Sequence, residues 1–137
     1  MNELVREWIE KAEADIRTAE REAVVTDRPN WDAVCLHAQQ SVEKYLKAIL
    51  QQKRIPFHKT HDLSSLAEPL LPTYPEWEAL SDSLKRLSLF AAELHYSGEA
   101  ASKQDAMQAV EAMRQWCSRL REPLGISKGA KKDPAAS

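Results

Sequence analysis

Apolar residues recur every three to four positions over most of the chain, which is the spacing of one buried stripe along an α-helix. The pattern predicts five helices, at about residues 2–25, 31–53, 60–70, 76–94 and 102–121. No strand-like alternation and no internal repeat interrupts it. The sequence therefore predicts an all-α fold, a five-helix antiparallel, up-and-down bundle.

Capping residues stand at several of these helix boundaries. Asn30 precedes the second segment, and either Thr60 or Asp62 precedes the third. Ser102, with Asp105 three residues later, has the pattern of a capping box at the fifth. Such side chains bond to the free backbone amides of a first helical turn, so they support the proposed starts.

Three segments lack the helical spacing. Residues 69–75 contain three prolines and are expected to form a loop. Residues 95–98, His-Tyr-Ser-Gly, are expected to form a turn after the fourth helix. Residues 123–137 are small and polar, and we expect a disordered tail there. The domain is accordingly predicted to span residues 1–122.

Length and charge narrow the class of protein. A chain of 137 residues is the size of one domain, and its net charge of −2 gives no overall attraction to DNA or to an anionic membrane. No apolar run approaches the roughly 18 residues of a membrane span, and no secretory signal is present, so we expect a cytoplasmic protein. Cys35 and Cys117 fall on apolar helix faces without C-x-x-C spacing. Buried reduced thiols are favoured over a disulfide or a metal site, and no metal is expected.

Polar residues of the second helix are the first candidates for a site. Successive helical residues advance by about 100°, which places Gln39 and Glu43 on the shoulder of the apolar stripe. Asp15 occupies a similar shoulder on the first helix. These three side chains are expected to form a polar network that sets the register between helices.

The far side of the second helix carries Gln40, Lys44 and Lys47, which are expected to face solvent or a partner. They form either a solvated face or a contact surface for a nucleotide or another protein. The sequence alone leaves both interpretations open.

Two histidines could carry acid–base chemistry. His61 stands beside Asp62, so the pair is either a general base with its orienting carboxylate or a packed histidine beside a helix cap. His95 and Tyr96 lie at the expected turn after the fourth helix, where functional groups often collect. No glycine-rich phosphate loop, H-E-x-x-H pair or nucleophile elbow is present.

Four stretches, in order, resemble the HEPN family, the helical domains named for higher eukaryotes and prokaryotes nucleotide-binding. Residues 8–15 resemble its W-x-x-x-A-x-x-D opening, and residues 38–48 its A-x-Q-x-x-E-K-x-L-K-A core motif. Residues 60–66 are similar to T-H-D-L-x-x-L. Residues 95–98 stand where the family usually carries R-Y-P followed by a small or acidic residue. The resemblance covers about residues 1–121.

The resemblance implies a helical homodimer that acts beside a separately encoded minimal nucleotidyltransferase, in a module of toxin–antitoxin type. A nucleotide such as ATP is then a possible ligand, with no other cofactor. Gln40, Lys44, Lys47, His61, Asp62, His95 and Tyr96 would be the binding residues. Other members are metal-independent ribonucleases, whose signature is an Arg and a His separated by four to six residues.

The chain departs from the ribonuclease pattern at the end of the fourth helix. His95 replaces the usual arginine, Ser97 replaces the usual proline, and no arginine stands at the required distance before His95. Arg54 and His61 fit the spacing formally, but they span a proline-containing loop. A histidine is only partly protonated near neutral pH and lacks the bidentate phosphate clamp of arginine. An interaction module is therefore our first hypothesis. The alternatives are an RNA-cleaving toxin using His95 or His61, and a structural bundle that oligomerises through tryptophans.

Overall fold

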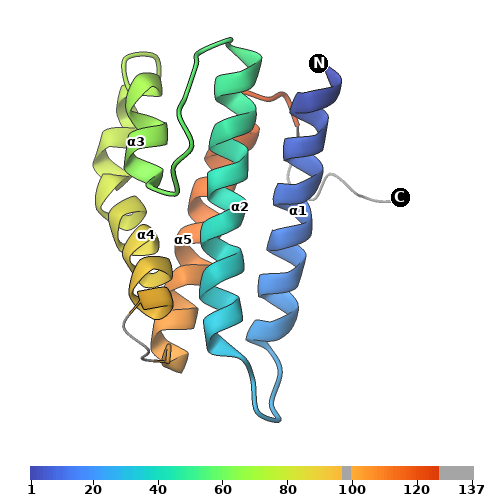
Figure 1. Ribbon diagram of the computed structural model, residues 1–137, viewed down its shortest axis with the longest axis vertical. Coiled ribbons are helices and arrows are strands. Elements are labelled where there is room, and N and C mark those ends of the chain that lie inside the picture. The colour runs from blue at the N-terminus through green and yellow to red at the C-terminus, as the bar shows by residue number, and fades with distance from the viewer. Residues whose placement is uncertain (97–99, 127–137) are drawn as a thin grey trace.

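The computed structural model describes the backbone of residues 1–96 and 100–126, and the side chains of these residues except 91–96 (Figure 1). Its elements in chain order are α1 (Glu3–Ala23), α2 (Trp31–Gln52), α3 (Leu63–Ala67), the 3₁₀ helices η1 (Glu68–Leu70) and η2 (Pro75–Leu80), α4 (Ser81–Tyr96) and α5 (Lys103–Arg121). Within these ranges every regular element is helical. The predicted all-α, five-helix bundle is confirmed.

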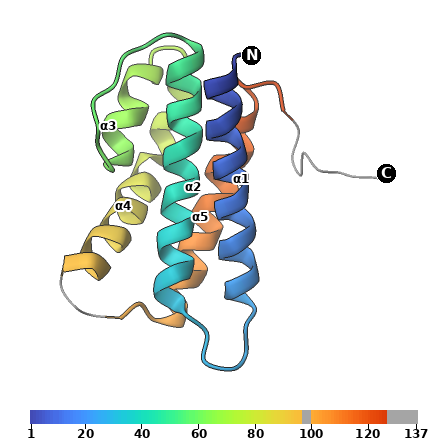
Figure 2. The same cartoon turned by 45° about the vertical axis from the view of Figure 1, so that its right-hand side comes forward.

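The long helix α2 is the centre of the bundle. It packs antiparallel to α1 on one side and contacts α5, α4 and α3 on the others. Figures 1 and 2 show α1, α2 and α5 side by side, with the shorter α3 and α4 forming a second group against α2. A helix with neighbours on most sides must bury most of its surface, and α2 does so for thirteen of its residues.

Helix caps fix the boundaries of these elements. Asn30 Oδ1 accepts a hydrogen bond from the Ala33 amide at 3.0 Å, at the start of α2. Asp62, rather than Thr60, caps α3 by accepting from the Ser64 amide. Ser102 and Asp105 form the predicted capping box of α5. These starts are where the sequence places them because each cap needs only local geometry.

The last residues of the α4–α5 connection are also hydrogen-bonded to the first turn of α2. Asp32, in the first turn of α2, accepts a hydrogen bond from the Ala101 amide at 2.6 Å, across 69 positions of sequence. Ala101 is itself buried. The start of α5 is thus tied both to its own cap and to the central helix.

The helical ends differ from the sequence prediction in two places. The proline-rich segment begins as η1 and resumes as η2, so only residues 71–74 are free of helix; prolines fit the first positions of a 3₁₀ turn. The helix expected to end at Leu94 continues to Tyr96. His95 and Tyr96 were predicted to lie in a turn after the helix. That prediction is wrong, because both residues belong to the C-terminal end of α4. Ser97 and Gly98 lie outside the described residues.

The chain beyond α5 is ordered for longer than expected. Residues 123–126 form a turn in which the Ile126 amide donates to the Arg121 carbonyl at 3.2 Å and Leu124 is only 4 % exposed. The prediction that the tail begins at Pro123 is wrong for these four residues, because Leu124 belongs to the core. The rest of the expected tail, residues 127–137, lies outside the described residues.

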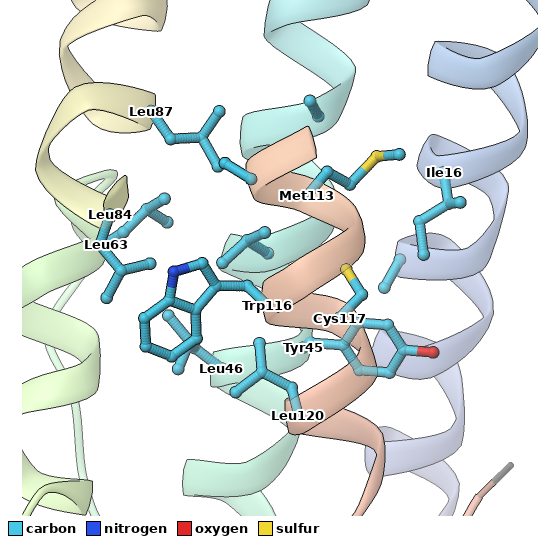
Figure 3. Close-up of a cluster of buried hydrophobic side chains, with 14 of the residues drawn as sticks. Ile16, Tyr45, Leu46, Leu63, Leu84, Leu87, Met113, Trp116, Cys117 and Leu120 are labelled. Carbon is cyan, nitrogen blue, oxygen red and sulfur yellow. The ribbon is translucent and has the colours of Figure 1, made fainter. Parts of the chain in front are cut away.

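Large side chains from α2, α4 and α5 form the core (Figure 3). The Trp116 indole points from α5 towards Leu63 and Leu84, and its Nε1 donates to Ser83 Oγ at 2.8 Å. The Trp77 ring meets Trp116 edge-on at 5.8 Å. Two of the four tryptophans are therefore core residues, and Trp8 and Trp31 are partly buried against the core.

Cys35 and Cys117 are both buried free thiols, as expected from their helix faces. Among the described helices, none combines the length and the hydropathy needed to cross a lipid bilayer.

Candidate functional site

Glu43, in the middle of α2, collects three hydrogen-bond donors around a buried carboxylate. Its oxygens accept from Gln39 Nε2 at 3.0 Å, Lys47 Nζ at 2.8 Å and His61 Nδ1 at 3.0 Å. Gln39 also donates to the His61 carbonyl at 3.1 Å. We call these four residues the Glu43 cluster. Three of its members lie on α2 and His61 lies in the α2–α3 loop, so the cluster joins the loop to the helix.

The electrostatics of the cluster keep Glu43 ionised. Burial by itself raises the pKa of the Glu43 carboxyl, but the hydrogen bonds from Lys47, Gln39 and His61 outweigh that effect and the net pKa lies below the usual value. Lys47 is also buried, and its ammonium lies 5.5 Å from the centre of the Trp8 ring on α1. The pair is thus a buried ion pair with an aromatic neighbour.

His61 is held in one orientation while its ring stays open to solvent. A carboxylate can only accept, so the Nδ1 that faces Glu43 carries a proton. The other ring nitrogen is left for an external partner, because the side chain is 80 % exposed. Of the two interpretations of the His61–Asp62 pair, the structure supports the one in which Asp62 is a helix cap. Asp62 binds Ser64 N and Ser65 Oγ as the cap of α3.

A second group of charges spans α1 and α2. The Asp15 carboxylate, buried on α1, accepts from His37 Nδ1 at 2.8 Å and from Lys44 Nζ. We call these three residues the Asp15 cluster. The single network expected for Asp15, Gln39 and Glu43 is therefore divided, since Asp15 binds residues on the opposite edge of α2. His37 was not among the predicted site residues; its position seven residues before Lys44, on the same helix face, is the signal that could have revealed it.

Lys44 and Lys47 were expected to face solvent or a partner, and in the structure both are ion-paired, with Lys44 partly exposed and Lys47 buried. Both ammonium groups turn sideways onto buried carboxylates, Lys44 onto Asp15 and Lys47 onto Glu43. Gln40 is half-exposed between them and, within the described residues, makes no side-chain hydrogen bond. The partly exposed residues His37, Gln40 and Lys44 form what we call the open strip of α2. In Figure 1, α2 lies between α1 and the α2–α3 loop.

A third charged group lies deeper and was not predicted. Glu13 of α1 accepts from Tyr45 Oη and from Arg121 Nε at 3.0 Å, and the Arg121 guanidinium lies 5.7 Å from the Tyr45 ring centre. Burial and the Glu13 carboxylate raise the pKa of Tyr45. The three residues join α1, α2 and α5, and their sequence separation of up to 108 positions left no local signal.

The remaining candidates, His95 and Tyr96, have their backbone in the last turn of α4, and their side chains lie outside the described part.

Two hollows are found elsewhere, one of about 540 Å³ between α4 and α5 beside Arg86 and Gln108, and one of about 360 Å³ beside Ser65 and Lys85. Neither is lined by the Glu43 or Asp15 cluster. No group of three metal-binding side chains occurs among the described residues.

The described residues form an all-α bundle. Two polar clusters, each built around a buried carboxylate, lie along its central helix α2. A family model described as HEPN domain matches residues 5–122. The chain belongs to the HEPN domain family. Comparisons with curated proteins and with solved structures gave no match.

Proposed function

We propose that this chain is a HEPN interaction module that binds a nucleotide or a partner protein through the open strip of α2. Its partner would be a separately encoded minimal nucleotidyltransferase, in a toxin–antitoxin-type module, and the chain would act as a homodimer. The contact residues would be Gln40, Lys44 and His61, with His95 and Tyr96 at the end of α4.

One observation carries this proposal. The partly exposed polar groups of the strip are oriented by carboxylates that are themselves buried, Asp15 under Lys44 and Glu43 under His61. A ligand meeting such groups finds them already ordered, which reduces the entropy lost on binding. Lys47 would hold Glu43 and would not touch the ligand, since its side chain is only 10 % exposed.

Co-expression with the product of the adjacent gene tests the proposal. We expect a stable complex on gel filtration, and ATP binding by calorimetry in the presence of the partner. Gln40→Ala should weaken the interaction at least tenfold, whereas Gln51→Ala, half-exposed on the same helix, should leave it unchanged. A chain that elutes alone and binds no nucleotide would reject the proposal.

A ribonuclease is the second candidate, and the His61–Glu43 contact favours it. An exposed imidazole held by a carboxylate through one ring nitrogen is the arrangement of a general acid or base. The reaction would proceed in EDTA, because the proposed chemistry uses no metal. The sequence around His95 argues against a ribonuclease, because no arginine stands four to six residues before this histidine.

Expression followed by RNA analysis separates the two functions. A ribonuclease predicts growth arrest and RNA loss that His61→Ala abolishes and that His58→Ala, an exposed histidine of the same loop, does not. His95→Ala tests the other candidate. If expression of the unaltered protein leaves cellular RNA unchanged, the ribonuclease is rejected and the interaction module remains.

A further inference from the structure

The smaller hollow, of about 360 Å³, lies between α3 and α4 and has the size of a small-molecule site. One wall is α3 with η1, and the other is η2 with the first turns of α4. The Leu63 amide at the start of α3 donates to Ser88 Oγ of α4 at 3.1 Å, and the chain reverses direction over residues 71–74. Figure 1 shows α3 and α4 together on one side of α2. The two walls are therefore antiparallel, and this hydrogen bond sets their register.

Buried apolar side chains form the floor of the hollow. Trp77, Leu84 and Trp116 line it, and none of the three is more than 2 % exposed. The Tyr74 ring stacks on Trp77 with 4.4 Å between the ring centres, and Trp116 is held by its hydrogen bond to Ser83. A floor that is already ordered takes the apolar part of a ligand with little loss of side-chain entropy.

The polar residues of the two walls are ordered by charge. Along α3 and η1 the lining residues are Ser64, Ser65 and Glu68; along the opposite wall, in the reverse direction, they are Lys85, Ser81 and Glu78. The register set by Leu63 and Ser88 brings Lys85 opposite the two serines. Glu78 stands seven residues before Lys85, which is about 10–12 Å along a helix of mixed 3₁₀ and α type. The hollow therefore has a cationic end and an acidic end.

The charged side chains around the hollow are available to a ligand. Glu68, Glu78 and Lys85 are exposed, and among the residues that the structure describes no side chain of opposite charge lies within salt-bridge distance of them. Solitary exposed charges are common on protein surfaces. Here charges of both signs share one hollow above an apolar floor and do not pair with each other. A ligand that carries both signs would neutralise them together.

Ser64 supplies an independent observation. Its Oγ is covered by protein and, within the described part of the chain, has no hydrogen-bond partner. A buried hydroxyl without a partner is unusual, because it has lost its water and gained nothing. Ser64 lines the hollow, and rotation about its single side-chain bond can turn the hydroxyl to a ligand without breaking another hydrogen bond. The neighbouring Ser65 hydroxyl is already engaged, since it donates to Asp62 at 2.9 Å.

We propose that this hollow binds a short zwitterionic peptide, with its carboxylate at Lys85 and Ser64 and its ammonium at Glu78 and Glu68. Both termini of a free peptide are charged near neutral pH. An extended tripeptide spans about 10 Å, which matches the separation of the two ends, whereas the charges of a single amino acid are only about 3 Å apart. Its apolar side chains would lie on the floor. The hollow is separate from the open strip of α2, so the inference does not rest on the proposed function.

Calorimetry with the tripeptide Ala-Leu-Ala tests the inference. We expect a dissociation constant of about 0.1 mM, the affinity usual for a ligand of this size. The N-acetylated and the C-amidated peptide each lack one charge, and each should bind at least tenfold more weakly. Free leucine should also bind at least tenfold more weakly, because it reaches only one end of the hollow.

Variants of the chain assign each charge to its end. Lys85→Gln should weaken binding of the free peptide at least tenfold but leave the affinity for the amidated peptide unchanged. Glu78→Gln should behave in the same way towards the acetylated peptide. The matched controls are Lys103→Gln and Glu76→Gln, which remove the same charges from exposed residues outside the hollow and should bind the free peptide normally.

Ser64→Ala separates binding from folding. It removes a hydroxyl that has no partner, so the melting temperature should not fall, whereas peptide affinity should drop at least threefold. No binding of Ala-Leu-Ala at about 1 mM, equal affinity for the free and the blocked peptides, or equal losses in the control variants would overturn the inference. None of these results bears on co-purification with a partner, so the two proposals fail separately.

Discussion

His61 donates a hydrogen bond from Nδ1 to Glu43 Oε1 at 3.0 Å, across eighteen positions of sequence. The contact fastens the α2–α3 loop to the central helix at the point where α3 begins. It also sets which nitrogen of the imidazole faces outward. One hydrogen bond thus fixes the path of the loop and the chemistry that the loop can offer.

Glu43→Gln should destabilise the protein at neutral pH by about 2–3 kcal/mol, because it leaves the buried Lys47 ammonium without a counter-charge. The pKa of Glu43 is lower in the folded state than in the unfolded chain. Its contribution is therefore complete above the unfolded value, near pH 4.5, and is lost as the pH falls through the folded one. Urea denaturation between pH 3 and pH 7 should show a shallower acid limb for the variant. Glu111→Gln, exposed on α5, is the control, and identical acid limbs for all three proteins would contradict the prediction.

Arg54→Gly should stabilise the protein by about 0.5–1 kcal/mol, because glycine adopts the left-handed conformation without strain. Thermal unfolding should shift upward by a few degrees. Arg54→Ala removes the same charge but keeps the strain, so its melting temperature should not rise. A melting temperature that rises equally in both would show that the charge, and not the backbone, was responsible.

Neither cysteine should react with a thiol reagent at pH 8 while the protein is folded. Burial raises the pKa of the Cys35 thiol to about 12, and burial likewise raises that of Cys117 to about 12. Thiolate is the reactive form, so both groups are protected by protonation and by inaccessibility. Ellman's reagent should count no thiols in native protein and two in guanidinium chloride. One fast-reacting thiol in the native state would contradict the burial of its helix face.

Truncation after Ile126 should leave stability unchanged, whereas truncation after Glu122 should cost about 2–3 kcal/mol. The shorter form loses Leu124, whose side chain is buried, and the turn that closes on the Arg121 carbonyl. Chemical denaturation of the two truncated forms compares them directly. Leu124→Ala in the full chain separates the side chain from the turn, and an effect under 0.5 kcal/mol would contradict its place in the core.

The fold could be predicted because the apolar spacing and the caps are local properties of the sequence. The directions of the Lys44 and Lys47 side chains could not be predicted, although helical spacing does give the place of each residue around α2. A lysine stem is long enough to carry its charge sideways around the helix to a buried carboxylate, so the position of Cα does not fix that of the ammonium. The contact of Glu13 with Arg121 joins residues 108 positions apart, which no local pattern encodes.

The central position of α2 has a consequence for how relatives of this protein are to be compared. The same helix carries the most recognisable motif of the chain and touches every other α-helix of the bundle. Glu43, Lys47 and the apolar residues of that motif are buried in the bundle, so folding needs them whether or not any ligand is bound or any reaction catalysed. Two relatives can share it completely and differ in activity. Their divergence is better sought in the connecting segments, where a changed residue alters recognition while the scaffold stays intact.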